Sequence, residues 1–262
     1  MGTKNQCIRL DQNSTMIEIF IFTFNRPDLL EIQVDCLKKF MINKFRINII
    51  HDTRTFEYSQ DFIDICEKLR NKYEDLEVRF HQHYSRERLS SSQYHARVLQ
   101  WVTDKLVTFE SAEICLFLDH DIFLVEEFNL IEELEDYDIM GLQQVRLDVK
   151  YVWPGLVAFR PSSCTEIDWN CGENLDTGGG TSKLLKNSNI RYKNYKVEYP
   201  DSYKEWSLKD LNITFGYNFE LHNEKFIHYR NACNWDTQYN LRDSIKTELL
   251  FLILKDFLNG LK

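Results

Sequence analysis

The sequence lacks the features of a linker, an export signal or a membrane anchor. It contains only four prolines and nine glycines among 262 residues, and no period repeats along it. No run approaches the ~20 apolar residues of a membrane span, and the N-terminal stretch lacks the apolar segment of a secretion signal. We therefore predict one domain over residues 1–262 without a transmembrane segment, although the LLFLIL run near the C-terminus leaves a peripheral membrane contact open.

Basic residues and paired cysteines are also scarce. The formal net charge is −9, which argues against a surface that neutralises a phosphate backbone, so a long nucleic acid is not expected as a partner. The seven cysteines form no C-x-x-C pair, and their odd number leaves one over in any scheme of disulfides. This pattern predicts reduced thiols and a cytoplasmic location.

The first half of the chain alternates apolar, strand-like runs with amphipathic, helix-like stretches. The strand-like runs are 17–24, 46–52, 77–80 and 114–118, and the helix-like stretches are 27–42, 56–73 and 90–106. Continuous apolar runs separated by helices are typical of parallel strands that are buried on both faces. We therefore predict an α/β fold with a Rossmann-like, mostly parallel central sheet flanked by helices.

The second half is less regular. Further strands are expected at 138–146 and 150–160, a turn that opens a short helix at 175–187, a strand followed by a loop at 226–235, and a C-terminal helix at 247–262. A regular front half followed by an irregular rear half suits a binding domain that continues into a substrate-shaping region.

Polar residues stand at the end of each strand-like run of the first half. Ligands of such sheets bind beyond the carboxyl ends of the strands, so these residues are expected to line one site. The four groups are Thr23-Phe24-Asn25-Arg26, His51-Asp52-Thr53, His81-Gln82-His83 and Asp119-His120-Asp121.

Asp119 and Asp121 interrupt the apolar run CLFLDHDIFLV. The preceding ICLFL predicts a buried strand, so the two carboxylates are expected at its exposed end. Mg²⁺ and Mn²⁺ prefer oxygen ligands and share them with substrate phosphates. The pair therefore predicts a divalent cation beside a diphosphate, while the alternative is a polar turn that binds nothing. His120, between the two, is expected to point away from the ligand.

Three motifs in this order resemble the GT-A fold of nucleotide-sugar glycosyltransferases with a GT-2-like layout: TFNRPDLL after the first strand, Asp52 at the second strand end, and the D-x-D of FLDHD. The resemblance implies that residues 17–125 bind the donor and residues 126–262 bind the acceptor. It also implies nucleoside contacts, and these fall on Thr23, Asn25, Arg26 and Asp52. Asp119 would contact the ribose and the metal, and Asp121 the metal.

The same resemblance implies further roles. His228 in FIHYRNACNW would be a late metal ligand, although a hydrogen-bonded core histidine is an equal alternative. Asp176 in LDTGGG would be the catalytic base, followed by Asp168 as second candidate. Independently of the resemblance, the position of Arg97 one turn into a helix would let it face diphosphate oxygens, although a solvated surface arginine is the commoner case. The usual acidic pair is absent around Asp176.

Other features have simpler readings. The glycines of LDTGGGTSKLL would allow an anion or sugar cradle, but a loop between elements is the commoner case. Trp153 would stack on a sugar or fill the core. His81 and His83 share a strand face as a zinc pair would, yet no third ligand lies nearby in the sequence.

The expected function is therefore metal-dependent transfer of a sugar, with inversion, from a nucleoside diphosphate sugar to a carbohydrate or glycoconjugate hydroxyl, assisted by Mn²⁺ or Mg²⁺. The alternative is a non-catalytic module of the same fold that binds a nucleotide sugar or a glycan. A haloacid-dehalogenase-like phosphohydrolase is disfavoured because its D-x-D follows the first strand. A sugar-nucleotide pyrophosphorylase is disfavoured because Phe24-Asn25-Arg26 replaces its glycine-rich loop.

Overall fold

The computed structural model describes residues 16–24, 26–53, 60–85, 87, 89–107, 112–201, 218–230 and 241–260. The strands are β1 Ile17–Thr23, β2 Phe45–Thr53, β3 Val78–Tyr84, β4 Ile114–Asp119, β5 Ile122–Leu124, β6 Ile139–Arg146, β7 Val149–Phe159, β8 Tyr192–Asn194, β9 Val197–Glu198, β10 Phe219–His222 and β11 Phe226–Tyr229. The helices are α1 Asp28–Phe40, α2 Gln60–Lys72, α3 Ser91–Lys105, α4 Leu130–Glu133, the 3₁₀ turn η1 Gly179–Thr181, α5 Ser182–Leu185 and α6 Leu241–Leu258.

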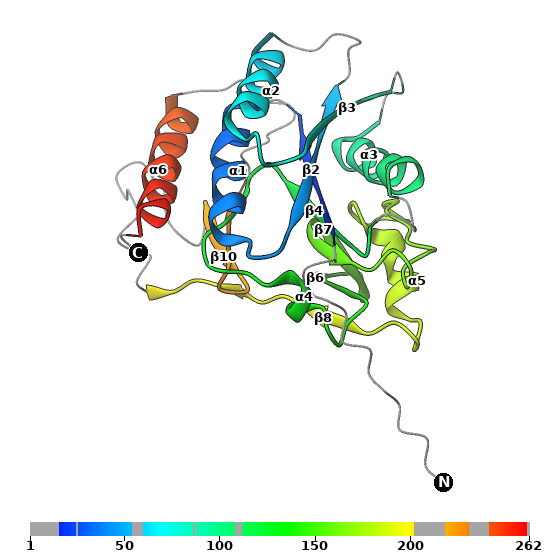
Figure 1. Cartoon of the computed structure of the whole chain (residues 1–262). Helices are drawn as coiled ribbons and strands as arrows, with labels where there is room; N and C mark the ends of the chain where they lie inside the picture. Colours follow the sequence, from blue (N-terminus) through cyan, green and yellow to red (C-terminus); the bar gives the residue numbers. More distant parts are fainter. Residues whose placement is uncertain are drawn as a thin grey trace.

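A seven-stranded sheet forms the centre of the described part, in the order β3-β2-β1-β4-β7-β6-β8. The four strands β3, β2, β1 and β4 run parallel, whereas β7 runs antiparallel to both β4 and β6. Figure 1 shows α1, α2 and α6 on one side of this sheet, and α3 and α5 on the other. The predicted α/β class with a mostly parallel sheet is therefore confirmed.

A second sheet was not predicted. It is antiparallel, has the order β5-β11-β10-β9, and joins segments that are far apart in the sequence. Strand β5 has three residues and β9 only two, so neither is long enough to show a periodic pattern. The pairing of β5 with β11, like that of β4 with β7, crosses the expected boundary at residue 125. The single domain, with a donor-binding half at 17–125 and an acceptor-binding half at 126–262, stays a prediction.

The central strands are apolar on both faces because helices cover both sides. In β1, Ile17, Ile19 and Ile21 pack toward α1, α2 and α6, while Phe20 and Phe22 pack toward α3. Strand β4 alternates in the same way. This alternation explains why the strands read as unbroken apolar runs in the sequence.

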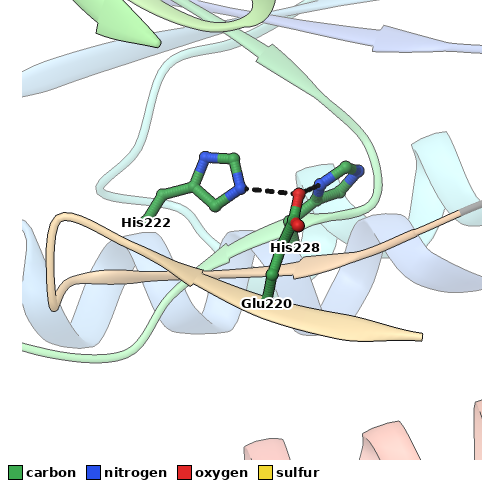
Figure 2. A group of neighbouring side chains, drawn as sticks. All are labelled: Glu220, His222 and His228. Atoms are coloured by element: carbon green, nitrogen blue, oxygen red, sulfur yellow. Dashed lines mark hydrogen bonds and ion pairs between the residues drawn. The ribbon is translucent and has the colours of Figure 1, made fainter. Parts of the chain in front are cut away.

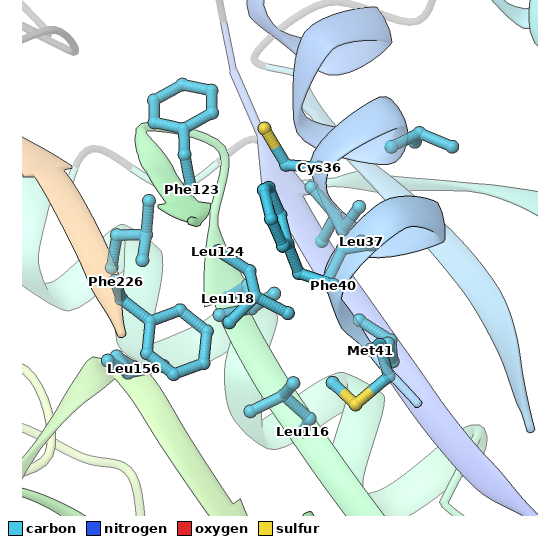
Figure 3. Packing of buried hydrophobic residues seen from close by; sticks show 14 of the residues in the cluster. Cys36, Leu37, Phe40, Met41, Leu116, Leu118, Phe123, Leu124, Leu156 and Phe226 are labelled. Carbon is cyan, nitrogen blue, oxygen red and sulfur yellow. The ribbon is translucent and has the colours of Figure 1, made fainter. Parts of the chain in front are cut away.

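Helix α1 contributes one large face to the core between the two sheets. Figure 3 shows Leu37 and Phe40 of this helix near Leu118 of β4 and Leu124 of β5, with Phe226 of β11 beyond them. All five side chains are buried. Because α1 contacts β5 directly, it fixes the point at which the chain leaves the first sheet and enters the second.

One expectation for the second half is confirmed and another needs correction. The turn that opens a short helix within 175–187 is present as the 3₁₀ turn η1 followed by the four residues of α5. The C-terminal helix begins at Leu241, six residues before the expected start, because the polar residues before Thr247 continue the same helix. The strand expected at the start of 226–235 is confirmed as β11, which ends at Tyr229, and the rest of the loop expected after it lies outside the described residues beyond Arg230.

The apolar C-terminal helix is packed against the protein. Leu250, Ile253, Leu254 and Phe257 of α6 are buried in the core that α1 shares, whereas Leu252 is exposed. Among the described residues, no helix combines the length and the hydrophobicity needed to cross a membrane. A peripheral membrane contact stays a prediction.

We predict that His51 makes folding sensitive to acid. Its ring is buried and stacked on Phe62 with 3.9 Å between ring centroids, and burial lowers its pKa to about 4. In the unfolded chain His51 takes up a proton below about pH 6.5, so acidification toward pH 4 stabilises the unfolded state. The free energy of unfolding should therefore fall by about 2–3 kcal/mol from this residue alone.

Urea denaturation at several pH values measures this effect. His51→Phe keeps an aromatic ring against Phe62 but removes the titrating group, so its stability should decline less steeply below pH 6.5 than that of the wild type. Equal slopes for the two proteins would refute the assignment.

Candidate active site

A cavity of about 490 Å³ opens where β1, β2 and β4 end. The strand register brings these ends level, since Phe22 pairs with Asp119 and Asp52 pairs with His83. The groups predicted at the ends of β1, β2 and β4 therefore line one cavity, whereas His81-Gln82-His83 of β3 is not part of this lining. Six of the predicted site residues line the cavity: Thr23, Asp52, Asp119, Asp121, Asp176 and His228.

The D-x-D motif is the turn by which the chain passes from β4 in the first sheet to β5 in the second. His120 lies at its centre and is buried, with its Nδ1 2.8 Å from the carbonyl oxygen of Phe22 and its backbone N–H donating to the same oxygen. His120 therefore ties the turn to the end of β1. His120 is nevertheless among the residues that line the cavity, so the expectation that it points away from the ligand stays a prediction.

Gln33 of α1 supports the same turn from inside the protein. Its Nε2 donates to the carbonyl oxygens of Asp119, at 2.9 Å, and of Ile122, at 2.7 Å. The side chain is fully buried. One amide group thus holds both ends of the turn that carries the two aspartates.

Asp119 faces His95, which comes from α3. The His95 Nε2 lies 3.3 Å from Asp119 Oδ1, and both residues line the cavity. Burial by itself lowers the pKa of His95, but attraction to the carboxylate outweighs it and the pKa is raised. Burial by itself raises the pKa of Asp119, and His95 again outweighs it, so that pKa is lowered. Each group therefore favours the charged form of the other, the carboxylate of Asp119 and the imidazolium of His95.

Asp121 faces His228 across the junction of the two sheets. Its Oδ2 lies 4.0 Å from His228 Nε2, while the other ring nitrogen, Nδ1, lies 2.9 Å from Glu220 Oε1. Figure 2 shows this carboxylate between the rings of His222 and His228. Because a carboxylate only accepts hydrogen bonds, Nδ1 carries the proton and Nε2 is the nitrogen that faces Asp121.

The space between Asp121 and His228 favours a positive charge. In neutral His228 with Nδ1 protonated, Nε2 presents a lone pair to a carboxylate oxygen, which is repulsive. A proton on Nε2 removes the repulsion. Burial alone would lower the pKa of His228, but the carboxylates of Glu220 and Asp121 raise it by more, so the pKa lies above its usual value. A divalent cation between the two groups would have the same effect, and carboxylate oxygen with imidazole nitrogen is a suitable ligand pair for Mn²⁺.

Trp153 of β7 closes one wall of the cavity. Its ring centroid is 5.1 Å from that of His228 and 5.7 Å from that of His222. The ring folds over Gly155, where an added Cβ would lie 2.3 Å from the indole and 2.8 Å from Asp119 Oδ2. Glycine is required there so that the aromatic ring and the carboxylate can approach the same backbone.

Thr23 and Asp52 lie on the nucleoside side predicted from the resemblance. Asp52 Oδ1 is 3.2 Å from His83 Nδ1, and both side chains are buried. The Thr23 hydroxyl is buried at the cavity and has no hydrogen-bond partner among the described residues. Since His83 faces Asp52 and His81 lies 3.2 Å from the amide of Asn48, the two histidines do not converge as a zinc pair would.

Asp176 reaches the cavity on the loop before η1, whereas Asp168 does not line it. The Asp176 carboxylate accepts the backbone N–H of Thr177 at 2.8 Å. Asp168 packs against Gly180, where an added Cβ would meet its carboxylate at 2.5 Å. Of the two candidates for the base, only Asp176 is therefore placed to meet a ligand in this cavity.

The glycine-rich segment is a packed turn. The backbone N–H groups of Gly178, Gly179 and Gly180 donate to the carbonyl oxygens of Trp169, Asp176 and Asn170. These donors are already used within the same loop, so the segment does not offer the anion cradle considered from its sequence.

Two predicted donor contacts lie outside the cavity. Arg26 makes a bidentate ion pair with Asp28, at 2.9 and 2.7 Å, and its NH2 group donates to Thr247 of α6. Arg97 pairs with Glu87 on the surface. Both guanidinium groups point away from the cavity because each forms an ion pair with a carboxylate that is close to it in the sequence. The remaining predicted contact, Asn25, lies outside the described residues.

Among the cavity-lining residues that were missed from the sequence, three carry titratable side chains: His95, Glu220 and Arg230. His95 looked like one more position of an amphipathic helix. Glu220 and His222 alternate just before a polar turn and His228 follows it, so the hairpin pattern in FELHNEKFIHY was the available signal.

The described lining is strongly acidic. Five carboxylates, from Asp52, Asp119, Asp121, Asp176 and Glu220, stand against the single guanidinium of Arg230. With His95 and His228 protonated the carboxylates still outnumber the cations by five to three. An anionic ligand would be repelled by this cavity unless a further cation accompanies it.

The sequence matches no protein-family model and no curated protein. Solved structures do match. The mannosyltransferase PcManGT from Pyrobaculum calidifontis, in complex with GDP-Man and Mn²⁺, is 12% identical with a TM-score of 0.49, over 68% of this chain and 54% of that one. The glycosyltransferase GlyE of Streptococcus pneumoniae TIGR4 is 12% identical with a TM-score of 0.49, over 94% and 63%. TarS 1-349 of S. aureus is 14% identical with a TM-score of 0.45, over 68% and 58%.

These neighbours are GT-A glycosyltransferases. They belong to the family that the sequence motifs resemble, and this chain spans between about half and two thirds of their lengths. Identities of 12–14% do not carry the ligands of these proteins over to this chain.

We predict that Gln33→Met destabilises the protein and loosens the D-x-D turn. Methionine matches glutamine in length but cannot donate, so two buried carbonyl oxygens lose this donor. The free energy of unfolding should fall by about 1–3 kcal/mol. Chemical denaturation measures the loss, and Gln60→Met, at an exposed position of α2, is the matched control and should change stability by less than about 0.5 kcal/mol. Equal stability of the two variants would contradict the role of Gln33.

Proposed function

We propose that the protein is a metal-dependent glycosyltransferase that moves a sugar from a nucleoside diphosphate sugar to the hydroxyl of a carbohydrate or glycoconjugate acceptor. The observation that carries the proposal is the position of Asp121 and His228. They are far apart in the sequence, yet Asp121 Oδ2 and His228 Nε2 lie 4.0 Å apart and face each other as atoms that need a positive charge between them.

The acidity of the cavity supports a cation as part of the donor complex. A diphosphate is itself anionic and would meet five carboxylates on entering alone. Asp121 and His228 would hold Mn²⁺ or Mg²⁺, with Asp119 beside them, and the imidazole ligand favours Mn²⁺ because Mg²⁺ prefers all-oxygen surroundings. When bound, the ion would neutralise negative charge on the leaving nucleoside diphosphate.

The remaining lining residues divide into a donor side and an acceptor side. Thr23 and Asp52 would contact the nucleoside at the ends of β1 and β2. Trp153 would offer an aromatic face to a sugar ring. Asp176, across the cavity on the loop before η1, would accept the proton of the acceptor hydroxyl, which is the role of a base in an inverting reaction.

A non-catalytic module that binds a nucleotide sugar is the second candidate function. The observation that favours it is the absence of a second carboxylate next to Asp176 in the LDTGGG segment. Such a module would need the cation and Asp52 but not Asp176. The cytoplasmic location stays a prediction; the five described cysteines are free thiols, four of them buried.

We predict that Asp121→Asn abolishes metal-dependent turnover and leaves the fold intact. The amide removes one charged ligand without changing the size of the side chain. Release of nucleoside diphosphate from a panel of nucleotide sugars, with and without Mn²⁺, should fall by at least about 100-fold, in line with the loss of a transition-state charge interaction. Glu126→Gln, an exposed carboxylate shortly after the motif, is the control and should retain activity. Full Mn²⁺-dependent activity in Asp121→Asn would exclude this metal site.

We predict that Asp176→Asn separates binding from turnover. The variant should bind the Mn²⁺–nucleotide complex as the wild type does, because Asp176 would act on the acceptor, while transfer falls by about 100-fold or more. Calorimetric binding and transfer to an acceptor measure the two effects. Asp168→Asn, on the neighbouring loop, should leave transfer near the wild-type rate. Transfer by Asp176→Asn at the wild-type rate would eliminate it as the base, and binding by the wild type without any turnover would favour the module.

A further inference from the structure

Glu220 is a buried carboxylate with several close neighbours. Its Oε1 lies 3.0 Å from His222 Nε2 and 2.9 Å from His228 Nδ1. Its Oε2 accepts a hydrogen bond from the hydroxyl of Tyr199 at 3.1 Å and lies 3.7 Å from Arg230 Nε. Burial by itself raises the pKa of Glu220, but the two histidines outweigh this cost, so its pKa is far below the usual value and the side chain is charged.

The hairpin of β10 and β11 creates this arrangement. Glu220 and His228 are directly opposite in the antiparallel register, and His222, two residues after Glu220, lies on the same face. A three-residue turn joins the strands, with positive φ at Asn223 and Glu224, which fixes the register. The contact between Glu220 and His228 is therefore set by the backbone.

This contact determines which nitrogen of His228 faces the cavity. Nδ1 donates to Glu220, so the ring is held in one orientation and Nε2 is left toward Asp121. A histidine that binds a metal through one nitrogen and donates to a carboxylate through the other is a common arrangement, because the carboxylate fixes the tautomer and makes the ligand more basic.

We propose that Glu220 is a positioning residue for the metal site, and that His222 holds Glu220 in place. Figure 2 shows the carboxylate between the two rings. This inference rests on the proposed function, which supplies the cation at Asp121 and His228. Glu220 itself does not bind the ion; it acts through His228.

A cation seated among Glu220, His222 and His228 is the competing arrangement, since one ligand atom from each lies within 4.8 Å of the others. Two observations favour the positioning role. Both histidines already lie at hydrogen-bond distance from the same carboxylate oxygen, so an ion among them would displace both contacts. His222 is also fully buried and packed against Trp153, away from the mouth of the cavity.

The test is titration of the full-length, metal-free protein with Mn²⁺ by calorimetry. Glu220→Gln and Glu220→Leu should each weaken Mn²⁺ affinity by a factor between about 10 and about 100. This is the usual loss when such a supporting group is removed. Tyr199→Phe is the matched control, because it removes a neighbour of Oε2 and leaves the contact with His228, so its affinity should stay within about twofold of the wild type. Circular dichroism without metal checks that each variant is folded.

A second readout reports on His228 directly. Long-range ¹H–¹⁵N spectra of the metal-free wild type, taken at a pH where His228 is neutral, should show the proton on Nδ1. In Glu220→Leu this preference should be lost, while Tyr199→Phe should keep it. A purely structural role for Glu220 would change stability without changing the tautomer.

The outcomes separate this inference from the proposed function. In one outcome the wild type binds Mn²⁺, Asp121→Asn does not, and both Glu220 variants bind as the wild type does. The positioning role of Glu220 is then wrong, while the proposed metal site stands. If His222→Phe abolishes binding while Asp121→Asn retains it, the ion sits among the three hairpin residues and the positioning role is refuted. If the wild type binds no Mn²⁺, the proposed function fails and this inference fails with it.

Discussion

The cost of burying carboxylates dominates the architecture of the site. A charged carboxylate loses its hydration when it is buried, and it stays charged only if a partner of opposite charge or a strong donor replaces the water. Here the partners are histidines. His83 faces Asp52, His95 faces Asp119, and His228 lies between Asp121 and Glu220. Imidazole suits this role because its proton can be lost when a metal ion arrives, whereas the charge of lysine or arginine is permanent.

The arrangement of the two sheets brings these partners together. The parallel strands present Asp52 and Asp119 at one edge, and α3 adds His95 from the side. Asp121 and His228 meet because β5 leaves the first sheet and pairs with β11. Gln33 and His120 hold the turn between β4 and β5, and they do so through main-chain carbonyl oxygens. The site is therefore built on rigid elements, with only Asp176 contributed by a longer loop.

Much of the fold was predictable from local patterns. The strands β1, β2 and β4 were located to within about one residue, because an apolar run bounded by polar residues is a local signal. The strands β9 and β10 were missed, since two to four residues carry no periodicity. Arg26 and Arg97 show a different limit. An arginine near a predicted site is as easily bound by a neighbouring carboxylate as by a ligand, and the sequence does not show the direction of its side chain.

By itself the sequence determined that the chain would form an α/β sheet with its polar residues at one edge. This follows because strand periodicity and the direction of parallel strands are local properties of the backbone. Only the tertiary structure decided which histidine would face which carboxylate. His95 comes from a helix and His228 from a short hairpin, and their contacts with Asp119 and Asp121 depend on packing between segments that are roughly 20 and roughly 100 residues apart along the chain. Such contacts leave no periodic trace, because hydrophobic burial positions the elements and the polar pairs form where those elements meet.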